Sequence, residues 1–376
     1  MGTIVHDGDS NRGSKRRKAV LIVGTLGGGG IHRYIEDQRD QLDDRFDVSV
    51  YDMRSNPKGQ GAVWFLRWLV LALVAVLRFP FRSRPDVVHV HTSHWFSFYR
   101  AAPYVLFAAY VWRLPVVLHI HGSSFDEFVA TESLSVSWLQ RLVFAASSEV
   151  VVLSAYWRDV LGDVVDTEKI RVVPNAVDPE IYDPSFAPHV PHVVFISNMI
   201  ERKGVLEFVE AIERLDERNR DVRVSIAGKG RLAEHVERLA ETHEHVEYLG
   251  YISEERKRAL LNEGSIFVLP TYAEGLPIAM LEAMAGGNAI VSTTVGSIPE
   301  VIDEEHGVLV EPGDVDGLVE AIDSLVTAPE RTANMARANR DAICETYSWS
   351  AATDALATLY ERETTGSRAN PDSPTA

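Results

Sequence analysis

The sequence predicts an α/β protein with two doubly wound, Rossmann-like domains that face each other across a cleft. Three observations support this. Short apolar strands alternate with helical segments from residue 19 onward, the alternation restarts at residue 192, and five prolines between 174 and 191 separate the two series. Continuous apolar strands that alternate with helices form a parallel sheet covered on both faces. Two such sheets place a ligand cleft between the carboxyl ends of their strands.

The first series predicts an N-terminal domain over residues 18–180. Its expected strands are 19–24, 48–53, 86–91, 115–121 and 149–154, with helices near 31–42, 95–112, 136–146 and 155–162. The polar, charged residues 1–17 before it are expected to form a disordered lead.

The second series predicts a C-terminal domain over residues 181–347. Its expected strands are 192–197, 222–227, 246–250, 266–269 and 289–292, with helices between them. A last helix is expected over 348–363, and residues 364–376 are expected to form a disordered tail.

Composition narrows the class of protein. The 376 residues are enough for two full cores, and a net charge of −17 argues against a nucleic-acid surface, which needs a basic face. The single cysteine, Cys344, excludes an internal disulfide and fits a reducing compartment. Residues 1–18 lack the apolar core of a signal peptide, so we expect a cytoplasmic protein.

The acidic surplus is combined with a scarcity of lysine, because only seven of the 37 basic residues are lysines. Carboxylates stay hydrated at high salt, where screening weakens their mutual repulsion. We therefore hypothesise a halophilic host. Unfolding in low-salt buffer would support this hypothesis, and full stability there would contradict it.

Residues 64–84 contain an unbroken apolar run at 68–77, flanked by Arg67 and Arg78. Ten apolar residues are too few to span a bilayer, which takes about 20. Two interpretations stay open: a buried helix of the first domain, or a helix lying on a membrane surface, where aromatic and arginine residues flank the apolar face. The second would place the protein peripherally on the inner face of the cell membrane.

Histidines gather at the ends of two expected strands, at positions 89, 91, 94, 119 and 121. We expect no metal site, because alternating histidines on a strand are taken to point to opposite faces and no carboxylate or thiolate completes a ligand set. His121 differs, since it precedes Gly122 at a strand's carboxyl end, where ligands bind in open α/β sheets. It is either a substrate contact or a histidine at the core's edge.

Glycine-rich turns follow two strands. The run 27–30, with Gly28 and Gly29 at its centre, could bring backbone N–H groups close to a phosphate or sugar, although a bare tight turn fits equally. Lys203 stands just before a helix in the second domain, where a cation and free N–H groups could hold a diphosphate. The turn 228–231 is a second glycine-rich turn at a strand end, and it is interpreted as a loop rather than as a second phosphate-binding turn.

The stretch 270–287 carries two carboxylates on one strand–turn–helix unit. Glu274 lies in the turn and Glu282 lies inside the helix that begins near Pro277. Carboxylates suit a site that grips sugar hydroxyls, because each accepts several hydrogen bonds. The alternative is an ordinary turn with a surface glutamate.

With these residues in view, residues 19–362 resemble the family-four retaining glycosyltransferases of the GT-B fold, also called glycosyl transferases group 1. Glu274-Gly275-Leu276-Pro277 with Glu282 resembles their E-x7-E motif, and Asn175-Ala176-Val177-Asp178 resembles their N-G-V-D segment. Residues 246–252 and 296–300 resemble two further family segments.

The resemblance implies roles for individual residues. Glu274, with the backbone of Gly275 and Leu276, would bind the donor sugar, and Glu282 would hold the ribose of the nucleotide. Lys203 would contact the diphosphate. His121 would contact the sugar, the backbone at Tyr251 and Ile252 would receive the base, and the helix over 348–363 would cross back to the first domain.

The segment expected to bind the diphosphate differs from the family's usual sequence at one position. Asn198 stands where the family usually has an arginine, and Arg202 is the candidate replacement four residues later. The departure puts diphosphate affinity in question.

The resemblance implies a retaining transfer, without a metal or other cofactor, from a nucleotide-sugar to a glycan, lipid-linked or protein-linked acceptor. No carboxylate of the motifs is placed as a covalent nucleophile, so the leaving diphosphate would accept the acceptor's proton. Two alternatives remain: a nucleotide-sugar epimerase of the same architecture, and a non-catalytic glycosyltransferase-like partner subunit.

Overall fold

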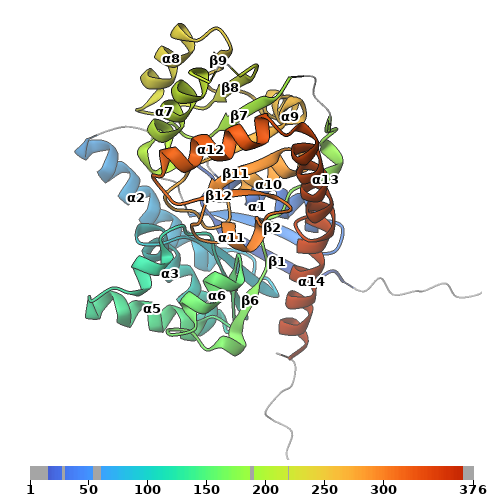
Figure 1. Ribbon diagram of the computed structural model, residues 1–376. Coiled ribbons are helices and arrows are strands. Elements are labelled where there is room, and N and C mark those ends of the chain that lie inside the picture. The colour runs from blue at the N-terminus through green and yellow to red at the C-terminus, as the bar shows by residue number, and fades with distance from the viewer. Residues whose placement is uncertain (1–15, 28–29, 54–60, 187–189, 219, 367–376) are drawn as a thin grey trace, which may run out of the picture.

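The computed structural model describes residues 16–27, 30–53, 61–186, 190–218 and 220–366 and contains two parallel six-stranded sheets, each covered by helices (Figure 1). The two-domain GT-B architecture that the sequence predicted is confirmed. Most of the predicted lead and tail lies outside the described residues.

The N-terminal sheet has the order β2-β1-β3-β4-β5-β6. Its strands are β1 Ala19–Gly24, β2 Asp47–Asp52, β3 Val87–Thr92, β4 Val116–Ile120, β5 Glu149–Val152 and β6 Ile170–Val172. Its helices are α1 Gly30–Leu42, α2 Ala62–Arg78, α3 Phe96–Leu106, α4 Phe125–Val129, α5 Leu134–Ala146 and α6 Ala155–Leu161. The strand order reverses between β1 and β3, and a ligand is expected beyond that point.

The C-terminal sheet has the order β12-β11-β10-β7-β8-β9. Its strands are β7 His192–Ile196, β8 Arg223–Ala227, β9 Val246–Tyr248, β10 Ile266–Leu269, β11 Ala289–Thr293 and β12 Gly307–Val310. Its helices are α7 Val205–Asp216, α8 Ala233–Thr242, α9 Glu254–Glu263, α10 Ile278–Ala285, α11 Ile298–Val301, α12 Val315–Val326 and α13 Pro329–Glu345. The order reverses between β7 and β10.

Two strands, β6 and β12, were not predicted. Both lie at the edge of a sheet and are only partly buried. Arg171 interrupts the apolar residues of β6, whereas β12 carries a short apolar run, 308–310, that the prediction overlooked. The interior strands, in contrast, fall within one or two residues of their predicted positions.

The two domains are packed against each other across the cleft. The indole N–H of Trp157 donates to the carbonyl of Gly275 at 3.2 Å, and the Asn175 amide donates to the carbonyl of Leu276 at 2.6 Å. Ser297 donates to Ser154 at 2.8 Å. These contacts join the loops after β10 and β11 directly to the N-terminal domain.

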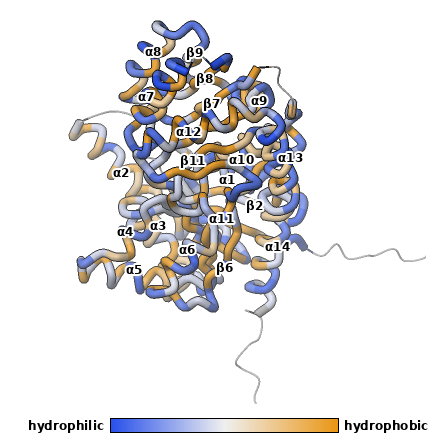
Figure 2. Tube along the Cα trace, viewed as in Figure 1, coloured by the Kyte–Doolittle hydropathy of each residue, from blue (hydrophilic) through white to orange (hydrophobic). Residues whose placement is uncertain are grey.

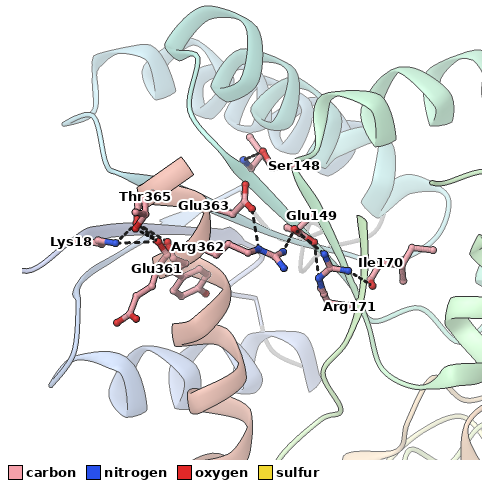
Figure 3. A network of polar contacts seen from close by, with 12 residues as sticks. Lys18, Ser148, Glu149, Ile170, Arg171, Glu361, Arg362, Glu363 and Thr365 are labelled. Atoms are coloured by element: carbon pink, nitrogen blue, oxygen red, sulfur yellow. Dashed lines mark hydrogen bonds and ion pairs between the residues drawn. The ribbon is translucent and has the colours of Figure 1, made fainter. Parts of the chain in front are cut away.

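The last helix, α14 Trp349–Gly366, packs on the N-terminal domain and runs past its predicted end at residue 363. Its Tyr360 is buried and accepts a 3.0 Å hydrogen bond from Gln38 of α1. Figure 3 shows the far end of the helix, where Arg362 pairs with Glu149 and Lys18 reaches the carbonyl of Glu361 at 3.3 Å.

Helix α2 projects from the N-terminal domain (Figure 1), and most of its residues are apolar (Figure 2). Only Trp68 and Ala75 are buried, whereas Leu66, Leu73 and Leu77 are each more than half exposed. The interpretation of this segment as a buried helix is therefore wrong. Among the described residues, 62–81 is a helical stretch long and apolar enough to cross a membrane.

Candidate active site

A cleft of about 480 Å³ opens where the strand orders of the two sheets reverse. Its walls combine loops that follow β1, β4, β7, β8 and β10. The predicted residues that line it are His121, Asn198, Arg202, Lys203, Tyr251, Ile252, Glu274, Gly275, Leu276 and Glu282. The structure thus brings together in one cavity residues from opposite halves of the chain.

Gly28 and Gly29 lie outside the described residues. The adjoining Gly30 and Ile31, at the start of α1, line the cleft. The described end of the run 27–30, Gly30, therefore belongs to the wall of the cavity.

Glu274 lies in the loop between β10 and α10, is 7 % exposed, and forms an ion pair with Lys203. The hydroxyl of Thr271 donates a second hydrogen bond to it at 3.1 Å. Gly204, which follows Lys203, has φ +68°, and a Cβ there would lie 1.9 Å from the carbonyl oxygen of Pro270. Only glycine allows the lysine-bearing turn to approach the Glu274 loop so closely.

Glu282 lies on α10, is 4 % exposed, and receives both its hydrogen bonds from one lysine. The ammonium group of Lys257 donates to its two carboxylate oxygens at 2.7 and 2.8 Å. Arg33 of α1 approaches Glu282 to 3.6 Å and also pairs with Glu254. Burial disfavours the charged Arg33, but these carboxylates outweigh it and raise its pKa.

Arg202, the candidate replacement for the arginine absent at Asn198, is already engaged. Its guanidinium donates to the carbonyl of Ala273 at 2.6 Å and to the hydroxyl of Ser123 at 3.3 Å. It thereby ties the Glu274 loop to the N-terminal domain. Asn198 lines the cleft as a neutral side chain.

His121 lies at the floor of the cleft and belongs to a buried histidine network. A hydrogen bond of 2.9 Å joins its Nε2 to Nδ1 of His91, and another of 3.2 Å joins His89 to His119. Burial lowers the pKa of His121 to about 3, so the imidazole is neutral near pH 7. A neutral ring with one nitrogen held by His91 keeps a fixed orientation toward the cavity.

The expectation that the alternating histidines point to opposite faces is wrong. Residues two apart on a strand share a face, and the rings of His89 and His91 stack with centroids 4.4 Å apart. Candidate ligand atoms of His89, His91 and His119 lie within 4.8 Å of one another. Nδ1 of His89 bonds the Tyr360 hydroxyl and Nε2 of His89 bonds Nδ1 of His119, so part of the cluster is a buried polar network. Nε2 of His91 and Nε2 of His119 have no hydrogen-bond partner among the described residues.

Sequence reasoning missed the two basic residues beside Glu282, Arg33 and Lys257. Arg33, Lys257 and Ser123 were not among the predicted site residues. The scarcity of lysine was the available signal, because three of the seven lysines, Lys203, Lys229 and Lys257, line this cleft.

Two facing Rossmann-like domains with a cleft at both reversal points define a GT-B protein, the architecture of a large class of glycosyltransferases. Comparison with family models agrees with this class for both halves of the chain. Residues 28–181 match the model described as Glycosyltransferase Family 4, and residues 190–328 match the model described as Glycosyl transferases group 1. The chain belongs to this glycosyltransferase family.

Several curated relatives match the chain at 27–31 % identity over the aligned residues. One component of human phosphatidylinositol N-acetylglucosaminyltransferase is 28 % identical over 76 % of this chain and 60 % of its own length. Its Arabidopsis thaliana counterpart is 31 % identical over 54 % of this chain and 46 % of its own length. The match thus spans about half the length of these relatives. Mycobacterium tuberculosis glycogen synthase is 27 % identical over 76 % of this chain and 70 % of its own length.

Solved structures share the fold across nearly the whole chain. Sucrose-phosphate synthase from Thermosynechococcus elongatus superposes with a TM-score of 0.74 at 18 % identity, covering 93 % of this chain and all of that one. Anabaena HepE in complex with UDP-glucose gives a TM-score of 0.71 at 15 % identity, covering 92 % and 100 % of the two chains.

Proposed function

We propose that the protein is a retaining glycosyltransferase that moves a sugar from a nucleotide-sugar to a glycan, lipid-linked or protein-linked acceptor. The observation that carries the proposal is the pair of nearly buried carboxylates, Glu274 and Glu282, held in one cleft where the C-terminal sheet reverses its strand order. A donor with a sugar at one end and a ribose at the other offers hydroxyls to both. A relative solved with UDP-glucose supports a donor of this class.

In the proposed complex, Glu274 accepts hydrogen bonds from the donor sugar and Glu282 accepts them from the ribose. The base lies against the backbone at Tyr251 and Ile252, whose side chains line the open end of the cleft. The diphosphate then lies between the two glutamates, within reach of Lys203. Binding exchanges the pairing of Lys203 with Glu274 for a pairing with phosphate, which releases Glu274 for the sugar.

The transfer breaks the bond between the anomeric carbon and the diphosphate oxygen and forms a bond to the acceptor oxygen on the same face. The acceptor's proton passes to the leaving diphosphate, so no enzyme carboxylate becomes covalently attached. Negative charge grows on the leaving group as the bond breaks, and cations fixed nearby stabilise that charge in the transition state. The protein's contribution is orientation and this charge stabilisation.

We further propose that the donor diphosphate needs no metal, because Lys203 and the helix that starts at Val205 supply positive charge beside it. Incubation of the protein with nucleotide-sugars and candidate acceptors should yield glycosylated product with retained anomeric configuration. EDTA should leave the rate unchanged. Loss of activity in EDTA with recovery on adding a divalent ion would contradict the metal-free mechanism. Conversion of the donor without acceptor would instead indicate an epimerase.

We also propose a cytoplasmic protein whose N-terminal domain rests on a membrane through α2. The apolar side chains of this helix face away from the domain, whereas Trp68 packs on Phe96 of α3 with ring centroids 4.9 Å apart. A helix docked by one face lies in the membrane plane rather than across it. Arg67 lies 5.5 Å from the ring of Trp64, an arrangement suited to the lipid headgroup region. A lipid-linked acceptor would be presented at that surface.

Flotation with vesicles tests this attachment. The wild-type protein should rise with vesicles that contain anionic lipid, and a Leu69→Asp/Leu73→Asp variant should stay at the bottom, because charges in the apolar face oppose insertion. Leu206→Asp, which changes an exposed leucine on α7 of the other domain, is the control and should float. A wild-type protein that never floats, or a double variant that floats equally well, would contradict the attachment.

A further inference from the structure

Four cations line the described part of the cleft: Arg202, Lys203, Lys229 and Lys257. Three of them are already bound within the protein. Lys203 and Lys257 pair with Glu274 and Glu282, and Arg202 donates to Ala273 and Ser123. Among the described residues, Lys229 differs from these three, because its ammonium group contacts only the face of the Tyr251 ring, 4.4 Å from the centroid.

The turn that carries Lys229 is built against the segment that carries Asn198. The carbonyl of Lys229 accepts a 3.1 Å hydrogen bond from the backbone N–H of Met199. Gly228 has φ +141°, and a Cβ at this position would lie 1.7 Å from the carbonyl oxygen of Ser197. The two turns therefore touch through their backbones and follow the paired strands β7 and β8.

The side chain of Lys229 is also steered toward the cavity. Tyr251 is 73 % exposed, and its ring holds the ammonium group at the rim of the cleft. The contact leaves the donors of Lys229 free, because an ammonium over a ring keeps its N–H groups available on the other side. An ammonium held in this way has lost part of its rotamer freedom before a ligand arrives.

We propose that Lys229 binds the diphosphate of the donor and supplies the positive charge that Asn198, on the adjoining turn, does not. This inference rests on the proposed nucleotide-sugar donor. Lys229 can bind a phosphate without leaving a carboxylate unpaired. Lys203, in contrast, must give up its ion pair with Glu274 before it can bind a phosphate. As the bond between sugar and diphosphate breaks, Lys229 also stabilises the negative charge that collects on the leaving group.

Calorimetric titration with UDP and GDP, and with uridine and guanosine, tests the assignment. Lys229→Met should bind the preferred nucleoside diphosphate at least tenfold more weakly than the wild type, and its affinity for the matching nucleoside should change less than twofold. Lys229→Arg should recover most of the loss. Arg231→Met removes a cation two residues away that pairs with Glu201 outside the cleft, and it should bind like the wild type.

Equal affinity of wild type and Lys229→Met for the diphosphate would overturn the inference and leave the proposed function intact. An equal loss of nucleoside affinity would assign Lys229 to the base and would also overturn it. A wild-type protein that binds neither UDP nor GDP would contradict the proposed function itself, and this inference with it.

Discussion

Replacement of Glu274 by alanine should lower the rate of sugar transfer by roughly two to four orders of magnitude, because the variant loses about two charge-assisted hydrogen bonds to the donor sugar. The carboxylate is nearly buried and is positioned by Thr271 and Lys203. A solvent molecule in its place would not hold the sugar in the reactive orientation. Steady-state rates at saturating donor measure the loss.

The control for this prediction is Glu207→Gln. Glu207 accepts a 2.6 Å hydrogen bond from Tyr272 of the same loop but does not line the cleft. It should retain its rate within about threefold, as expected of a side chain outside the site. Transfer by Glu274→Ala at the wild-type rate would exclude Glu274 from the reaction.

Replacement of Glu282 by glutamine should weaken donor binding and lower the stability of the protein together. Glutamine cannot match the two short contacts to Lys257, whose remaining carboxylate partner is Glu254, so we expect a loss of about 1–3 kcal/mol. The ammonium of Lys257 and the guanidinium of Arg33 would then share one carboxylate, Glu254, in place of two.

The double variant Glu282→Gln/Lys257→Met separates the two effects. Removal of both charges should restore much of the thermal stability, because the double variant no longer holds an ammonium that has lost its contacts to Glu282, and Glu254 still pairs with Arg33. Donor affinity should remain at least tenfold below that of the wild type, since the ribose has lost its acceptor. A double variant that binds donor as tightly as the wild type would show that Glu282 does not hold the ribose.

Periodicity was enough to predict the fold. Interior strands such as β1 and β10 are continuous apolar runs, and their positions alone imply two parallel sheets and a cleft at their carboxyl ends. The edge strand β6 escaped prediction because Arg171 interrupts its apolar residues, whereas the short apolar run of β12 was overlooked.

The candidate site was predictable only in part. Glu274 and Glu282 belong to one short stretch, so their spacing is visible in the sequence. Their partners Lys203, Lys257 and Arg33 come from elements far apart along the chain, and only the folded structure brings them together.

The residues proposed to bind the diphosphate were also predictable only in part. Arg202 was the natural candidate to replace the arginine absent at Asn198, but its guanidinium is used by Ala273 and Ser123. Lys229 was interpreted as part of a loop, because nothing in the sequence shows that β7 and β8 are paired and that their following turns touch.

Helix α2 shows how composition can mislead. An apolar run is equally consistent with burial and with a surface that meets lipid, and the choice depends on what packs against it. In the folded chain Trp68 and Ala75 face the domain, and most other apolar side chains of the helix face outward.

The central claim is that the cleft holds a nucleotide-sugar between Glu274 and Glu282. Thermal unfolding with a panel of UDP- and GDP-sugars tests it most directly, because a ligand that binds only the folded state raises the midpoint by mass action. We expect at least one donor at about a hundred times its dissociation constant to add about 2.7 kcal/mol of stability, and this gain to be reduced in the Glu282→Gln/Lys257→Met variant. Unchanged unfolding of the wild type with every donor in the panel would contradict the claim.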